Sequence, residues 1–327
     1  LEKLSWQDLG SEERQLCPPL LLIGSDEMLA GRGLGQLMSV LNSGLPIKVL
    51  VLHALDFGLA SEPGKATAQA PINNPRSSLA LLALAQRNAY VAQTSIADAS
   101  HLGESMLQAL HHDGPALLQV YAPSPTRHGF ASDQTIAQAE LALRSRAMPL
   151  FRYDPAVDGV FGARISLAGN AEATAALAFN DADEQPFGAA DWAFGQRRFS
   201  AHFQALDDDA TAPLALHEWL QLDTRNRSKQ TPYLAVGQGE RRRRYSMTAA
   251  MSDMAALCAE TWQTLQELAG VVTPFTERLE QKFRAEVAAE HQAQLDAQTE
   301  DADARILEMQ KKTEAEIAAK IRSRLMD

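Results

Sequence analysis

The residues with the clearest chemical potential follow an apolar run near the start of the chain. Residues 20–23 lead directly into Gly24-Ser25-Asp26-Glu27 and then into a glycine-spaced helical pattern. A strand, a turn and a helix in this order present a phosphate or a metal-bound diphosphate at the carboxyl edge of a parallel sheet. The oxygens of Ser25 and Asp26 would then face a divalent cation. The structural alternative is a serine N-cap followed by acids in the first helical turn.

A second group with possible chemistry follows the next apolar run. His53 and Asp56 lie at its end, and an imidazole beside a carboxylate can act as a general acid–base pair. A surface or interface pair is the interpretation that we favour for these two residues. The G-x-G-x-G run at residues 31–35 begins too far from the preceding strand for a dinucleotide fingerprint, so we assign it to close packing of a helix on the sheet.

These residues need a sheet to position them, and the apolar pattern predicts one. Four runs rich in Val, Ile and Leu, at residues 20–23, 47–52, 89–96 and 116–121, have the length of strands and are apolar on both faces. Helical patterns separate them. This alternation predicts an α/β fold with a mostly parallel sheet flanked by helices. Residues 61–79 are rich in Pro, Asn, Ser and Gly and are expected to form a long functional loop.

The remaining chain divides into two parts. Between 157 and 250 the pattern weakens, and no fold is assigned to it. Residues 251–327 are predicted to be helical, with a break at Gly270 and Pro274. The last helix has apolar residues near four-residue spacing without a strict heptad, so we expect it to pack on a neighbouring domain or subunit, with a coiled coil as the alternative. The expected domains are therefore 1–156, 157–250 and 251–327.

The composition indicates a globular protein and argues against several classes. A chain of 327 residues that is 46% apolar can bury a large core. The net charge of −11 argues against a nucleic-acid partner. The arginine run 241–244 is assigned to a solvated loop, with a docking patch for an acidic partner as the alternative. No apolar run is long enough to span a bilayer, and no signal peptide is recognised, so no membrane partner is expected.

The cysteines bear on metal clusters and on the compartment. The chain has two of them, Cys17 and Cys258, far apart and in no CxxC pair. They cannot build an iron–sulfur cluster or a structural zinc site by themselves. We therefore expect no iron–sulfur cluster within this chain, and a reducing, cytoplasmic location.

Several segments resemble one known family in their order and spacing. They are IKVLVLHALDFG, GKAT, NAYVAQTSI, DGPALLQVYAP, RHGF and MPLFRYDP. Together they are similar to the thiamine-diphosphate-binding domain of pyruvate:ferredoxin (flavodoxin) oxidoreductases, over roughly residues 18–156. The resemblance implies the thiamine-diphosphate-binding fold and a magnesium ion on the cofactor's diphosphate. It also implies decarboxylation of a 2-oxoacid, with electrons passed to ferredoxin or flavodoxin.

The resemblance implies a set of site residues as well. In the family a Gly-Asp-Gly turn supplies a magnesium ligand, and an Asn-Thr pair on the next strand's loop supplies further oxygens. Here Gly24 is kept, Ser25 stands at the position of the ligating Asp, and Asp26 stands at the second glycine. Asp26 is therefore the candidate metal ligand, one residue beyond the family's position. Leu59 and Ala60 replace the Asn-Thr pair. The candidate cofactor-binding residues are Gly24, Ser25, Asp26, Asp56, Leu59, Ala60 and His128.

Most of the expected oxygen donors are missing at these positions. Magnesium requires near-octahedral oxygen ligation, and Leu59 and Ala60 cannot ligate it. Two hypotheses follow. The chain is part of a 2-oxoacid:acceptor oxidoreductase, works with its other domains or subunits and forms a homo-oligomer; or it is a non-catalytic scaffold or pairing domain that keeps the fold and has lost the cofactor. In either case the chain alone is expected to be inactive.

Overall fold

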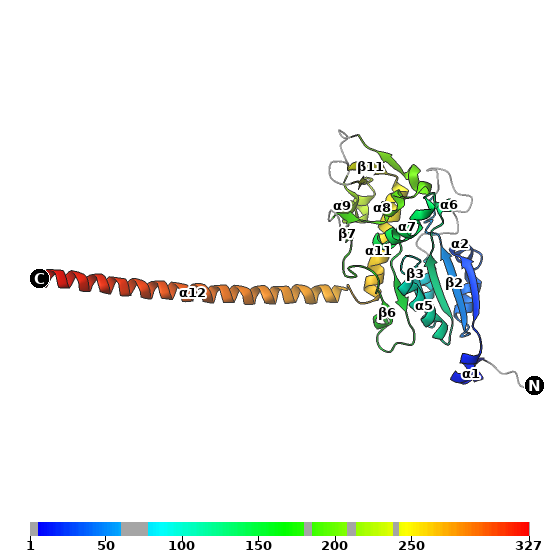
Figure 1. Ribbon diagram of the computed structural model, residues 1–327, viewed down its shortest axis with the longest axis horizontal. Coiled ribbons are helices and arrows are strands. Elements are labelled where there is room, and N and C mark those ends of the chain that lie inside the picture. Colours follow the sequence, from blue (N-terminus) through cyan, green and yellow to red (C-terminus); the bar gives the residue numbers. More distant parts are fainter. Residues whose placement is uncertain (1–5, 60–77, 180–184, 208–213, 238–241, 327) are drawn as a thin grey trace, which may run out of the picture. The chain divides into compact units, whose positions relative to one another are not determined.

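The computed structural model describes residues 6–59, 78–179, 185–207, 214–237 and 242–326. The chain divides into two compact units, Leu1–Val271 and Val272–Asp327. The first unit contains a six-stranded sheet in the order β1-β2-β4-β3-β5-β6 (Figure 1). The predicted α/β fold with a mostly parallel sheet is confirmed.

The first four strands are parallel and coincide with the four predicted apolar runs. They are β1 (Leu20–Ser25), β2 (Ile47–His53), β3 (Tyr90–Ser95) and β4 (Ala116–Tyr121). Two short strands, β5 (Phe151–Tyr153) and β6 (Ile165–Ser166), extend the sheet in the antiparallel sense. Because the parallel strands all end at one edge, residues that follow them meet there.

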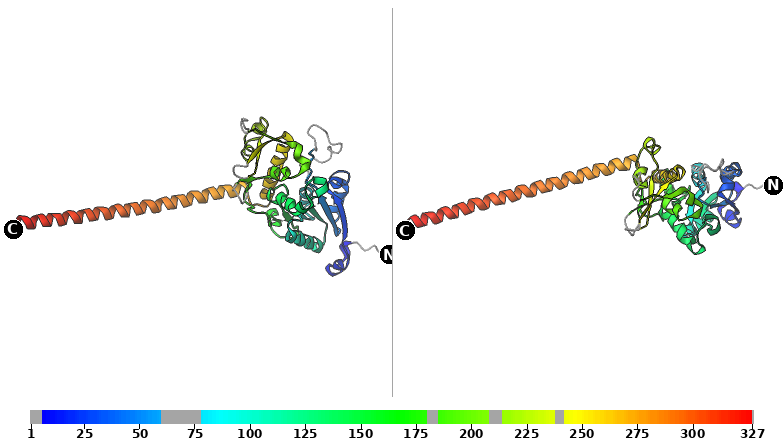
Figure 2. Two further views of the ribbon diagram at one scale, coloured as in Figure 1. Left: turned by 45° about the horizontal axis from the view of Figure 1, so that its top comes forward. Right: turned by 90° about the horizontal axis from the view of Figure 1, so that it is seen from above.

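Helices cover both faces of the sheet (Figure 2). Alternate strand residues such as Val49 and Val91 pack with α3 (Leu34–Leu41) and α4 (Leu79–Gln86). Their neighbours along the strands, such as Ala92 and Leu118, pack with α5 (Ala99–His111). This alternation is what a period of two residues produces in a strand that is buried on both faces.

Strand β1 departs from this expectation. Leu20, Leu21, Leu22 and Ile23 are between 40% and 62% exposed. The sequence predicted a strand covered on each side, and that part of the prediction is wrong for β1. The apolar composition is correct, but β1 is an edge strand, and the described elements of this chain leave its side chains accessible.

The segment that received no fold from the sequence joins the same core. A cluster of buried residues brings Tyr121 at the end of β4 together with Trp192, Trp219 and Met254. The helices in and next to this segment are α6 (Pro125–His128) and α7 (Thr135–Arg144), which precede it, α8 (Ala189–Phe194), α9 (Leu216–Leu220) and α10 (Thr224–Arg227), which lie in it, and α11 (Ala249–Leu268), which begins near its end. Its strands are β7 (Ala178–Phe179), β8 (Pro186–Phe187), β9 (Phe203–Ala205), β10 (Tyr233–Val236) and β11 (Arg243–Met247).

The first compact unit thus extends across positions 156 and 250. The division into domains 1–156, 157–250 and 251–327 stays a prediction. Three further α-helices are described. A short α1 (Ser11–Leu16) precedes the sheet, and α2 (Asp26–Ala30) follows β1. Helix α12 (Pro274–Met326) forms the second unit as one continuous helix. Among the described residues, the helices are too short or too polar to cross a bilayer.

Candidate functional site

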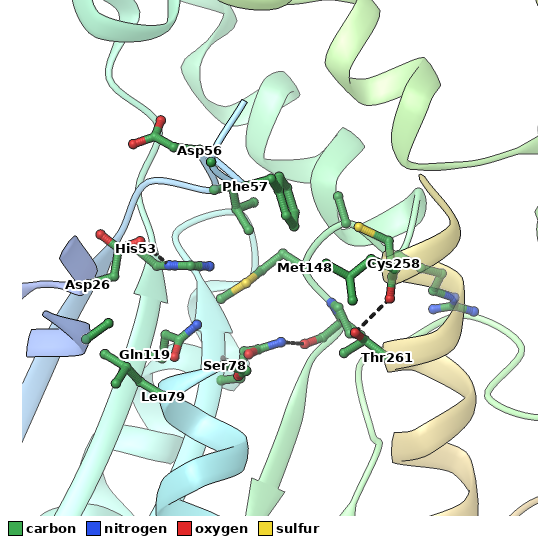
Figure 3. Close-up of a pocket in the computed structure, with 18 residues that line it drawn as sticks. Asp26, His53, Asp56, Phe57, Ser78, Leu79, Gln119, Met148, Cys258 and Thr261 are labelled. Atoms are coloured by element: carbon green, nitrogen blue, oxygen red, sulfur yellow. Dashed lines mark hydrogen bonds and ion pairs between the residues drawn. The ribbon is translucent and has the colours of Figure 1, made fainter. Parts of the chain in front are cut away.

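A small cavity lies where the parallel strands end (Figure 3). Its volume is about 100 Å³. Acidic, amide and imidazole groups line one part of it, and Met148, Leu257 and Cys258 line another. Of the predicted site residues, the cavity brings together Asp26 and Asp56. Gly24, Ser25, Leu59 and His128 are not among the described residues that line it.

Asp26, the predicted metal ligand, lies at the carboxyl end of β1, and this region around Asp26 and the end of β2 is called the corner below. The carboxylate of Asp26 already accepts hydrogen bonds. Nδ1–H of His53 donates to Oδ2 of Asp26 at 2.5 Å, and the backbone N–H of Ala54 donates to the same oxygen at 3.2 Å. The N–H of Glu27 donates to Oδ1 at 2.9 Å. Burial acts to raise the pKa of Asp26, but the bond and charge of His53 and the two backbone donors outweigh it, so this pKa lies below its ordinary value.

The turn before Asp26 has the structural role that the sequence offered as the alternative. Oγ of Ser25 accepts a hydrogen bond from the N–H of Met28 at 3.3 Å, so Ser25 is an N-cap. The helix that it caps, α2 (Asp26–Ala30), has five residues. A helix of this length provides a weak dipole for a diphosphate.

Asp56 is held by two arginines rather than by His53. Nη2 of Arg127 donates to Oδ2 of Asp56 at 2.5 Å, and Nη1 of Arg198 donates to Oδ1. Arg198 also donates to the carbonyls of Ala54 and Leu55 at 3.1 and 3.2 Å. The His53–Asp56 contact that acid–base chemistry would need is therefore not formed, because His53 turns to Asp26 (Figure 3).

The arginines hold a turn with an unusual backbone. Leu55 and Phe57 have φ angles of 55° and 51°, a left-handed conformation that costs energy in residues with a β-carbon. Arg198 is 10% exposed and packs over the ring of Phe199 at 4.4 Å. Burial lowers the pKa of Arg198 to about 10, while the charge of Asp56 acts in the opposite direction. The guanidinium thus stays charged at neutral pH and fixes the turn.

His128 lies in the core rather than in the cavity. It is 1% exposed, and neither ring nitrogen has a hydrogen-bond partner among the described residues. Burial, reinforced by the positive charges of Arg198 and Arg127, lowers its pKa to about 4. The following Gly129 has a φ of 75°, and a β-carbon there would lie 2.7 Å from Cβ of Arg197. Only glycine fits this approach.

The other predicted residues have structural surroundings. A β-carbon on Gly24 would press on Leu29 at 3.2 Å, so this glycine permits the packing of α2 on β1. Leu59 packs against the core cluster around Trp192. Ala60, and the loop predicted at 61–79 except for its last two residues, lie outside the described residues.

The sequence analysis missed several residues of this region. Gln93 and Gln119 are partners across β3 and β4 and line the cavity. Gln119 accepts from the N–H of Ala80 at 3.1 Å, and Gln93 donates to the carbonyl of Pro149 at 2.7 Å. Two amides inside otherwise apolar strands were a signal that could have identified them. Arg198 carried no such signal, since it lies in the segment without an assigned fold.

The residues present do not fit a magnesium-bound diphosphate. The carboxylate of Asp26 already accepts three hydrogen bonds, Ser25 caps a helix and Leu59 is apolar. Among the described residues no group of three His, Cys, Asp or Glu side chains is placed to hold a metal ion. The described residues at this corner therefore do not supply an octahedral set of oxygen donors.

Comparison with known proteins gives a partial relationship. No family model matches the chain. It is 30% identical over 144 residues to a pyruvate:ferredoxin oxidoreductase of Moorella thermoacetica, and 26% identical over 160 residues to a pyruvate-flavodoxin oxidoreductase of Rhodospirillum rubrum. Over this stretch the chain is a distant relative of pyruvate:ferredoxin and pyruvate:flavodoxin oxidoreductases. The predicted resemblance to these oxidoreductases is supported over this stretch, and the assignment to their thiamine-diphosphate-binding domain stays a prediction.

The matches cover 41% and 45% of this chain, and 12% and 13% of these two relatives. A shorter match, 33% identical over 73 residues, links the chain to ketoisovalerate oxidoreductase subunit VorB of Pyrococcus abyssi. It covers 22% of this chain and 24% of that subunit. The chain therefore corresponds to a small part of these relatives, which are themselves large chains or subunits of an assembly.

Proposed function

We propose that this chain is a non-catalytic pairing domain or subunit that derives from 2-oxoacid oxidoreductases. It retains the α/β scaffold of a thiamine-diphosphate-binding domain and has lost the cofactor. One observation carries the proposal: the carboxylate of Asp26 is bonded to His53 and to the N–H of Ala54. A magnesium ion would compete with these donors for the carboxylate, and the other described carboxylate that lines the cavity, Asp56, is held by two arginines.

The second acid of the corner supports the same conclusion. Asp56 bridges Arg127 and Arg198, so both carboxylates that line the cavity already have cationic or polar partners. Neither carboxylate is left without a partner to take up a metal ion, so a diphosphate placed here would lack the cation that normally bridges it to the protein.

The exposed face of β1 supports a pairing role. Leu21 and Ile23 lie on the same face of the sheet as Leu52 of β2, as the parallel register requires. These side chains are 57%, 62% and 46% exposed. Contiguous apolar surface on an edge strand is typical of a site that another chain or domain covers.

A second candidate function is the one that the family resemblance implies. In it the chain is an active cofactor-binding part of a 2-oxoacid oxidoreductase, with thiamine diphosphate and magnesium. The relatives and the cavity at the strand ends favour it. The donor set at Asp26 does not, so we place it second.

Calorimetry of the full chain with thiamine diphosphate and magnesium tests the proposal. We expect no saturable binding, which corresponds to a dissociation constant weaker than about 1 mM. Saturable binding in the micromolar range would contradict the proposal and favour the second candidate.

A restored site provides the positive control. The variant carrying Ser25→Asp, Leu59→Asn and Ala60→Thr returns the oxygen donors that the family places at these positions. We expect it to gain magnesium-dependent binding, whereas a matched variant with Ser25→Asn in place of Ser25→Asp should not. If the restored variant also fails to bind, loss of these ligands is not the explanation.

A further inference from the structure

Helix α12 exposes a continuous apolar stripe that the second unit does not cover. Val287, Leu295, Ile306, Ile317 and Ile321 are between 42% and 64% exposed. Burial of these side chains against another helix would stabilise α12, and the helix alone does not bury them. The complete stripe, called the α12 stripe below, is Val287, His291, Leu295, Thr299, Ala302, Ile306, Met309, Thr313, Ile317 and Ile321.

The two threonines of the α12 stripe are compatible with burial. Oγ1 of Thr299 donates to the carbonyl of Leu295 at 3.1 Å, and Oγ1 of Thr313 donates to the carbonyl of Met309 at 2.8 Å. Each hydroxyl is thus satisfied within the helix. The methyl groups of both threonines remain available for packing against another helix.

The spacing of the α12 stripe is symmetric about residue 304. Its members follow one another at four-residue intervals, except for three-residue intervals from Thr299 to Ala302 and from Ile306 to Met309. Read from either end, the order of intervals is the same. Two antiparallel copies would therefore place Val287 opposite Ile321 and Leu295 opposite Thr313.

The mean interval also indicates the twist of the pair. Because most intervals are four residues, the mean exceeds the 3.6 residues of one helical turn. The stripe therefore drifts around the helix in the direction that gives a right-handed supercoil. A left-handed coiled coil needs a mean interval of about 3.5 residues, and this explains why the sequence of α12 shows no strict heptad.

The charges distinguish antiparallel from parallel pairing. Residues 286–303 carry six acidic side chains and no Lys or Arg, whereas residues 305–322 carry five Lys or Arg and three acidic ones. A parallel pair would place the two acidic segments side by side. An antiparallel pair centred on residue 304 places each acidic segment against the basic segment of the other copy.

We propose that α12 pairs with α12 of a second copy of this chain, in antiparallel orientation and centred on residue 304. The apolar stripe supplies the seam, and the opposed acidic and basic segments select the orientation. This proposal is independent of whether the first unit binds a cofactor.

Sedimentation equilibrium of the full chain tests the pairing. The wild-type chain should be a dimer, and Ile317→Asp should raise the dissociation constant at least about a hundredfold, because two aspartates per dimer enter an apolar seam. The matched control is Ala315→Asp, which adds the same charge at an exposed position on the opposite face. It should change the dissociation constant less than about threefold. A monomeric wild-type chain at about 50 μM would overturn the proposal.

Disulfide trapping tests the orientation. In a Cys17→Ser background, which removes the exposed native thiol, two proteins carry Val287→Cys and Ile321→Cys respectively. Mixed under oxidising conditions, they should form the mixed disulfide between positions 287 and 321, and each alone should form little. Efficient 287–287 disulfides would indicate parallel pairing and overturn the proposal. So would a dimer that persists in Ile317→Asp and yields no 287–321 disulfide.

Discussion

At the scale of single residues, the chemistry of the corner is decided by what each carboxylate contacts. Asp26 and His53 are 19% and 22% exposed, so their hydrogen bond is partly shielded from water. A charge-assisted bond of this kind is stronger than one between neutral groups. The bond therefore stabilises the junction of β1 and β2, and under the function proposed above it keeps Asp26 from binding a metal.

The substitution Asp26→Asn should reveal that contribution. We expect it to lower the free energy of unfolding by about 1–2 kcal/mol at neutral pH. Since the pKa of Asp26 lies below its ordinary value of 3.8, this stabilisation is present above about pH 4 and is lost as the pH falls through the folded-state pKa. Urea unfolding at neutral pH and at a pH below the folded-state pKa of Asp26 measures this loss of stability. Glu27→Gln, at a more exposed acid, is the control and should cost less than about 0.5 kcal/mol.

Two buried histidines should make the stability of the first unit depend on pH. Burial, with a contribution from Arg152, lowers the pKa of His101 to about 4, and His128 has the same value for the reasons given above. Unfolded histidine takes up a proton near pH 6.5. The unfolded state therefore binds more protons between about pH 4 and 6.5, and stability should fall as the pH is lowered through that window.

The contribution of His128 can be isolated. Its shift corresponds to roughly 3 kcal/mol over the window, and His128→Leu should remove that part of the slope. Urea unfolding from about pH 7 to about pH 4.5 measures both proteins. Equal slopes in the two proteins would mean that His128 titrates normally in the folded state.

Individual positions were partly predictable from the sequence. Asp26 and Asp56 were expected at the carboxyl edge, and the structure places both at the cavity there. Their partners were not predictable. The bond from His53 depends on the alignment of β1 with β2, and Arg198 approaches Asp56 across 142 positions of sequence. Contacts of that kind depend on tertiary packing, which local patterns do not encode.

At the scale of elements, the turn after β2 is held in place from a distant segment. Arg198 belongs to a 3₁₀ helix, Arg197–His202, and bonds to the carbonyls of Ala54 and Leu55 as well as to Asp56. The left-handed residues of the turn depend on these bonds. The segment between 157 and 250 thus shapes the corner that lies on the first part of the chain.

Truncation of this arginine should destabilise the turn. Arg198→Ala is expected to cost about 3 kcal/mol, because it removes a nearly buried partner of a carboxylate and leaves two carbonyls unpaired. Arg127→Ala is the matched control. Its side chain is 51% exposed, so it should cost less than about 1 kcal/mol. Similar losses in chemical denaturation for the two variants would show that Arg198 has no special role in the turn.

The sequence predicted the elements of the sheet better than their exposure. Apolar runs located β1 to β4 to within two residues at each end, because buried parallel strands have few polar positions. The same composition could not distinguish β1 at the edge from β4 at the centre. Residues 157–250 resisted prediction because their strands are two to five residues long, which is too short for a periodic signal.

At the scale of the whole molecule, the chain consists of two units with different sources of stability. The three apolar clusters of the described residues contain no residue beyond Val271. The first unit therefore has its own core. Helix α12 has exposed apolar side chains instead, so its stability must come from pairing or from contacts along the helix.

A chain that ends after Thr273 should therefore keep the fold of the first unit. We expect its melting temperature to lie within about 3 °C of the full chain's value, since no core side chain is lost. Differential scanning calorimetry measures it, with near-ultraviolet circular dichroism as a check on packing around the tryptophans. A drop of about 10 °C or more would mean that α12 contributes to the core.

The most direct test of the central claim observes His53 and Asp26 themselves. ¹⁵N NMR of the His53 imidazole reports the proton on Nδ1 and its bond to the carboxylate. During a titration with magnesium and thiamine diphosphate, we expect the His53 signals to stay unchanged up to about 1 mM of each. A saturable shift of those signals, with loss of the Nδ1–H bond to Asp26, would show that the carboxylate is released to a metal and would contradict the account.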